Sequence, residues 1–91
     1  MPQKDERARR ALSLLLKLGP AITFTLGESK PEVEAVYHRA RDLGREVGDR
    51  PNLFRATWGL WMYANRQGEG QSRKWTEELT FVAEQLADDN F

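Results

Sequence analysis

The chain has 91 residues, with 14 basic and 14 acidic side chains, 40% hydrophobic residues and no cysteine. This length fits one domain with a modest core, and the lack of cysteine excludes disulfides, thiolate nucleophiles and cysteine-bearing zinc sites. The balanced charge argues against a dedicated nucleic-acid binder, because such proteins rely on a surplus of lysine and arginine. We therefore expect a small soluble domain whose composition fits a reducing, cytoplasmic location.

The first apolar segment is predicted to form a helix over roughly residues 5–24. Its apolar residues follow two stripes, Leu12, Leu15, Leu16 and Ile22 on one and Leu14, Leu18 and Ala21 on the other. Two stripes predict burial on more than one side of the helix. Gly19-Pro20 is expected to kink or split it, because proline lacks an amide donor. Together with Lys17, this break argues against a signal peptide or a membrane span.

The second helix is predicted over residues 31–47, where one apolar face alternates with a charged one. Ser29 followed by Glu32 predicts a capping box, with Pro31 in the first turn, where its missing donor does no harm. Gly48 is expected to end the helix.

The third helix, predicted over residues 51–66, is apolar nearly all round, so it should have neighbours on several sides. The fourth, predicted over residues 72–88, has a single apolar stripe. Val36, Ala40, Leu43 and Val47 superpose on Trp75, Leu79, Val82 and Leu86 with one constant offset, which indicates a weak internal repeat of two helix pairs. The predicted fold is all-α, with two stacked antiparallel hairpins in a right-handed array. A four-helix bundle is the alternative.

Four stretches of the chain resemble the tetratricopeptide-like helical region of large bacterial ATPase and nucleotide-cyclase signalling proteins. They are LLKLGPA at 15–21, KPEVEAVY at 30–37 with RARDL at 39–43, GDRPNLF at 48–54, and WGLW at 58–61. The last two are the most specific. The resemblance implies stacked helical hairpins that act as an interaction or regulatory scaffold without catalytic residues of their own.

No group of residues has the pattern of a catalytic, metal or cofactor site, so we expect no enzyme, no cofactor and no small-molecule substrate. His38, beside Glu34, is interpreted as an exposed helix residue rather than a general base. Residues 68–74, with two glycines and two cations, are interpreted as a turn, with anion binding as the alternative. The basic groups near Arg7 and Arg41 are interpreted as solvated faces.

The aromatic residues of the third helix exceed what two flanking helices can cover. We therefore expect an exposed apolar interaction surface, and the residues predicted to form it are Leu14, Leu18, Trp58, Trp61, Tyr63 and Trp75. The sequence thus predicts a non-catalytic protein-interaction or regulatory module that self-associates, as a homodimer, or docks on a protein partner. The alternative is a small nucleic-acid-associated regulator using the basic N-terminal helix.

Overall fold

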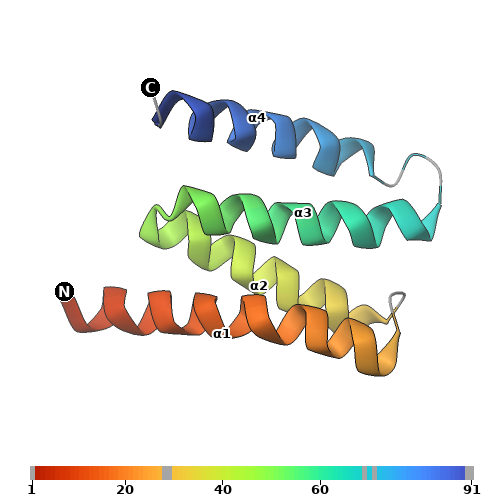
Figure 1. The fold of residues 1–91 in the computed structure, drawn as a ribbon, viewed down its shortest axis with the longest axis horizontal. Coiled ribbons are helices and arrows are strands. Elements are labelled where there is room, and N and C mark those ends of the chain that lie inside the picture. Colours follow the sequence, from red (N-terminus) through yellow and green to blue (C-terminus); the bar gives the residue numbers. More distant parts are fainter. Residues whose placement is uncertain (1, 28–29, 69, 71, 90–91) are drawn as a thin grey trace.

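The computed structural model describes residues 2–27, 30–68, 70 and 72–89, and within these ranges the chain forms four α-helices and no strand. They are α1 (Pro2–Leu26), α2 (Pro31–Val47), α3 (Arg50–Gln67) and α4 (Arg73–Asp89) (Figure 1). The predicted all-α class and the four helices are confirmed. Helix α2 has the predicted bounds, and the other bounds differ by three residues or fewer.

Helix α1 runs without interruption through Gly19 and Pro20, so the predicted split is wrong. A proline inside a helix costs about 3 kcal/mol, because one hydrogen bond is lost and its ring crowds the preceding turn. Packing before the proline offsets part of this cost, because α1 packs against α2 and Leu12 is buried at 1% exposure. The Thr23 hydroxyl also donates to the Gly19 carbonyl at 2.8 Å, within the turn that follows the proline.

The boundaries of α2 and α3 follow from local chemistry. Gly48 caps α2 in the left-handed region, with φ 71°, as predicted. Asp49 then caps α3, because its carboxylate accepts the Asn52 backbone N–H at 3.2 Å. The predicted capping box is corrected: Lys30 is the N-cap of α2 and its side chain makes no capping bond, while Ser29 lies outside the described residues.

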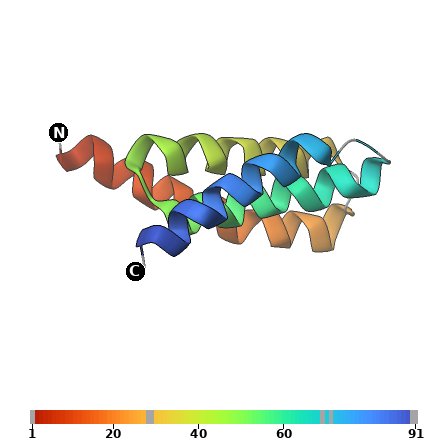
Figure 2. The same cartoon turned by 90° about the horizontal axis from the view of Figure 1, so that it is seen from above.

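The helices form an open array rather than a closed bundle. Helix α1 packs against α2 and α3, and α3 also packs against α4. Helices α1 and α4 lie on opposite sides of the central pair and do not meet within the described ranges (Figure 1). Seen edge-on, α2 lies on one side of the array and α3 with the second half of α1 on the other, while α4 crosses diagonally (Figure 2). In this arrangement, α1 and α3 lie side by side on one face.

The core has two parts. The first joins α1, α2 and α3 through Leu12, Ala40, Leu43 and Ala56. The second joins α3 and α4 through Leu60, Ala64 and Trp75, with Tyr37 and Trp61 packed against it. Among the helices of the described chain, none is long and apolar enough to cross a membrane.

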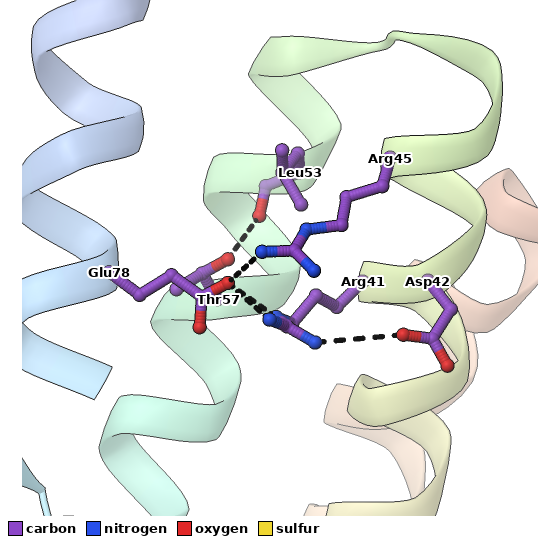
Figure 3. A network of polar contacts seen from close by, with 6 residues as sticks. All are labelled: Arg41, Asp42, Arg45, Leu53, Thr57 and Glu78. Carbon is purple, nitrogen blue, oxygen red and sulfur yellow. Dashed lines mark hydrogen bonds and ion pairs between the residues drawn. The ribbon is translucent and has the colours of Figure 1, made fainter. Parts of the chain in front are cut away.

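Charged side chains also tie α2 to α4, at a junction that we call the α2–α4 seam (Arg41, Arg45 and Glu78). Arg41 Nε donates to Glu78 Oε1 at 2.7 Å, and Arg45 Nη2 donates to the same oxygen at 2.9 Å (Figure 3). The side chains of Arg41 and Glu78 are each only 14% exposed. Arg41 Nη1 also lies 3.6 Å from Asp42 Oδ1, so the nearly buried Arg41 guanidinium has two carboxylate neighbours, Glu78 and Asp42.

Candidate docking groove

A groove follows the interface of α1 and α3 on the face where these two helices lie side by side. We call it the α1–α3 groove. Its main hollow has a volume of about 410 Å³ and is lined by Pro20, Thr23, Phe24, Val33, Tyr37, Arg55, Trp58, Gly59, Met62, Tyr63 and Arg66. An adjoining hollow of about 340 Å³ extends it along α1 and is lined by Ser13, Leu16, Lys17, Pro20, Tyr37, Asn52 and Arg55. The two hollows share Pro20, Tyr37 and Arg55, so they form one surface.

Tyr37 of α2 forms the floor of this groove because two glycines make room for its ring. A Cβ added at Gly59 would lie 2.3 Å from Tyr37 Cδ1, and one added at Gly19 would lie 2.6 Å from Tyr37 Cζ. Any other residue at either position would displace the ring or push the helices apart. Burial raises the pKa of Tyr37 above its ordinary value.

The rim of the groove is apolar and open to solvent. Phe24 on α1 is 94% exposed, while Trp58 and Met62 on α3 are 46% and 37% exposed. Trp58 is also held in a row of aromatic rings, with its centroid 6.4 Å from that of Phe54 and 5.4 Å from that of Trp61. The rim therefore presents a large, ordered apolar side chain at the mouth of a hollow, as binding sites for proteins do.

The charge of the groove has one sign. Lys17, Arg55 and Arg66 line it, and none of its described lining residues is acidic. Arg55 Nη1 donates to the Asn52 side chain at 3.5 Å, a long bond within the same helix. Although the whole chain is neutral, the groove is positive, so it favours a partner that carries carboxylates beside apolar groups.

The six residues of the predicted interaction surface do not form one surface. Trp58 and Tyr63 line the groove. Leu14 and Leu18 are exposed, at 59% and 45%. However, each follows a groove residue by one position, which places it about 100° further around α1. They therefore belong to a separate apolar edge.

Trp61 and Trp75 are placed inward. Trp61 is half-buried, and its Nε1 donates to the Thr76 hydroxyl at 2.8 Å, which fastens α3 to α4. Trp75 is only 7% exposed, so its assignment to a surface is corrected: it belongs to the core. The Arg41 guanidinium lies 5.2 Å from its ring centroid, which extends the α2–α4 seam onto the indole.

The weaker site candidates also have structural roles. His38 is half-buried and packs edge-on against Trp75, with ring centroids 5.3 Å apart, so its interpretation as an exposed residue is wrong. In the 68–74 turn, residues 69 and 71 lie outside the described residues, and Lys74 Nζ lies 4.9 Å above the Trp75 ring. The described part of the chain contains no group of three His, Asp or Glu side chains placed to hold a metal ion.

The basic start of α1 is also partly engaged. Arg9 Nε donates to Asp5 at 2.8 Å, and its Nη2 donates to the Val47 carbonyl at the end of α2 at 3.1 Å. The hydrogen bond with Asp5 raises the pKa of Arg9. One of the cations on which the nucleic-acid alternative depends is thus engaged within the fold.

Sequence reasoning missed most of the groove. The sequence places Tyr37 on the apolar face of the second helix, Gly19 at a break and Gly59 in a motif. It gives no signal for Arg55 or Arg66. The local signal for such a site is weak, because the glycines and the ring that they accommodate lie on three different helices.

No family model, curated protein or solved structure matches this chain.

Proposed function

We propose that this protein is a non-catalytic protein-interaction module that binds a segment of another polypeptide in the α1–α3 groove. The observation that carries this proposal is the groove's exposed apolar rim around a hollow of about 410 Å³. Removing the exposed apolar side chains of this rim from water would stabilise a complex by about 25 cal/mol per Å² of apolar surface buried. The module would act in the cytoplasm, as the cysteine-free composition suggests.

The cations give the groove a preference among peptides. Arg55 and Arg66 lie at the two ends of the main hollow on α3, with Trp58 and Met62 between them. Charges at the edge of an apolar surface select and orient a partner more than they add affinity. A segment with an apolar residue between carboxylates suits this pattern.

The nucleic-acid alternative is less well supported by the same contacts. Proteins that bind single strands combine cations with aromatic stacking surfaces, and the groove has both. However, the described residues that line it include three cations, and Arg9 of the proposed basic helix is engaged by Asp5 and the end of α2. Few phosphates would be neutralised, so binding of this type would be weak at physiological salt.

The proposal is tested by selecting peptides from a random library on the immobilised protein. We expect enrichment of peptides with acidic residues around an aromatic or aliphatic one. Their binding should be lost in Arg55→Glu and kept in Arg39→Glu, which makes the same charge change on an exposed residue of α2 outside the groove. Equal binding to both variants, or no enrichment, would overturn the proposal. Tighter binding to oligonucleotides, falling steeply with salt, would favour the alternative.

A further inference from the structure

The outward face of α4 carries a second unusual pattern, which we call the acidic stripe: Glu77, Phe81, Glu84 and Asp88. These residues follow one another at spacings of four, three and four, so they lie along one line of the helix. All four are exposed, and Phe81 is 60% exposed. No lysine or arginine occurs between Glu77 and Asp88. The stripe is therefore an aromatic side chain between carboxylates on a helix.

The stripe has the same length as the distance along α3 between the two arginines of the main hollow. Arg55 and Arg66 are 11 residues apart on α3, and Glu77 and Asp88 are 11 residues apart on α4. At 1.5 Å per residue both pairs span about 16 Å, and 11 residues make nearly three whole turns, which keeps each pair on one side of its helix. Between the charged ends lie Trp58 and Met62 in the groove and Phe81 on the stripe.

Their charges are complementary as well. Among the described residues the groove has three cations and no carboxylate, while the stripe has three carboxylates and no cation. Arg41 and Arg45 of α2 both reach α4, and both pair with Glu78, which is outside the stripe. The groove and the stripe thus carry opposite charges, each beside exposed apolar side chains.

We infer that the α1–α3 groove binds the acidic stripe of a second copy of this chain, with Phe81 in the hollow and the carboxylates beside the groove's cations. This inference rests on the proposed function and names its partner. The two surfaces are different, so the contact is heterologous and joins copies head to tail. It is therefore unlike a symmetric homodimer through the Leu14 and Leu18 edge, because each copy donates a stripe to one neighbour and receives one from another.

The test is the mass of the full chain in solution, measured by light scattering across a concentration series. The groove variant is Arg55→Glu, with Arg39→Glu as its matched control. The stripe variant is Phe81→Ser, with Leu14→Ser as its control, since Leu14 and Phe81 are equally exposed at 59% and 60%. We expect the mass of the wild type to rise with concentration, and each variant to weaken association at least about tenfold while the controls do not.

Mixing gives the sharpest result. Arg55→Glu retains an intact stripe, and Phe81→Ser retains an intact groove, so an equimolar mixture should form a 1:1 dimer that neither variant forms alone. A wild type that stays monomeric at high micromolar concentration would overturn the inference. The inference would also be overturned if Leu14→Ser, and not Phe81→Ser, weakened the association. If the wild type is monomeric but selected peptides still bind the groove, the proposed function stands and only the second copy is the wrong occupant.

Discussion

The α2–α4 seam and the α1–α3 groove join helices in opposite ways. At the seam, Arg41 and Glu78 are almost buried and satisfy each other's charge, and Arg41 also lies over the Trp75 ring. At the groove, Trp58 and Met62 are left in solvent around a hollow. One pair of helices is thus joined by paired charges, while the other pair leaves apolar side chains in solvent. We infer that the seam holds the array together, while the groove is kept for a partner.

The seam should show the larger effect on stability. Replacing Glu78 by Ala leaves Arg41, at 14% exposure, without its main carboxylate. We expect a loss of about 2–3 kcal/mol in the free energy of unfolding, since removing one member of a buried ion pair strands the other. Urea denaturation measures this loss, and Glu46→Ala on the exposed face of α2 is the control. A loss as small as that of the control would mean that the seam contributes no stability.

A substitution at the floor of the groove should give a somewhat smaller loss of stability, and the sign of its effect should reverse when Tyr37 is removed. Gly59→Ala places a Cβ against Tyr37, so we expect a loss of about 1–3 kcal/mol from overpacking. In a Tyr37→Ala background the same change should instead stabilise by about 0.5–1 kcal/mol, because alanine is the better helix former. Thermal unfolding of the four variants measures both signs. A loss in both backgrounds would show that Tyr37 is not the cause.

Tyr37 should also make stability depend on alkaline pH. Its pKa in the folded chain is raised above the ordinary value of 10.0 by burial. The stabilising contribution is therefore complete below pH 10 and falls as the pH rises toward the folded pKa, because the unfolded chain loses the proton first. Denaturant unfolding at about pH 9 and about pH 11 should show a smaller decline for Tyr37→Phe than for the wild type. Equal declines would assign the effect to other groups.

The smallest effect on stability is expected at the rim of the groove. Arg55→Glu changes an exposed residue with one long hydrogen bond to Asn52, so the free energy of unfolding should change by less than about 0.5 kcal/mol. The same variant should lose peptide binding. Loss of peptide binding without loss of stability would show that Arg55, unlike the residues of the seam, contributes to binding and not to folding. A large loss of stability would contradict this difference.

The parts of this structure that the sequence could predict are those fixed by local chemistry. The bounds of α2 follow from Pro31 in the first turn and Gly48 after the last, and the apolar stripe of α4 predicts its packing. The parts that it could not predict depend on neighbours distant in the chain. Trp58 and Trp75 are chemically alike, yet one is 46% exposed and the other 7%, because Trp75 packs against both α2 and α3. Periodicity gives a residue's face but not what covers it.

The open order of the helices has a consequence for how the chain folds. Helix α1 packs on α2, α2 on α3, and α3 on α4, so most contacts form between segments adjacent in sequence. Proteins with such local contacts fold fast, since little loop entropy is lost before each contact is made. Helix α4 is attached on one side of the array, so its amide protons should exchange with solvent before those of α3. Local opening at this end can therefore occur while the remaining three helices stay folded.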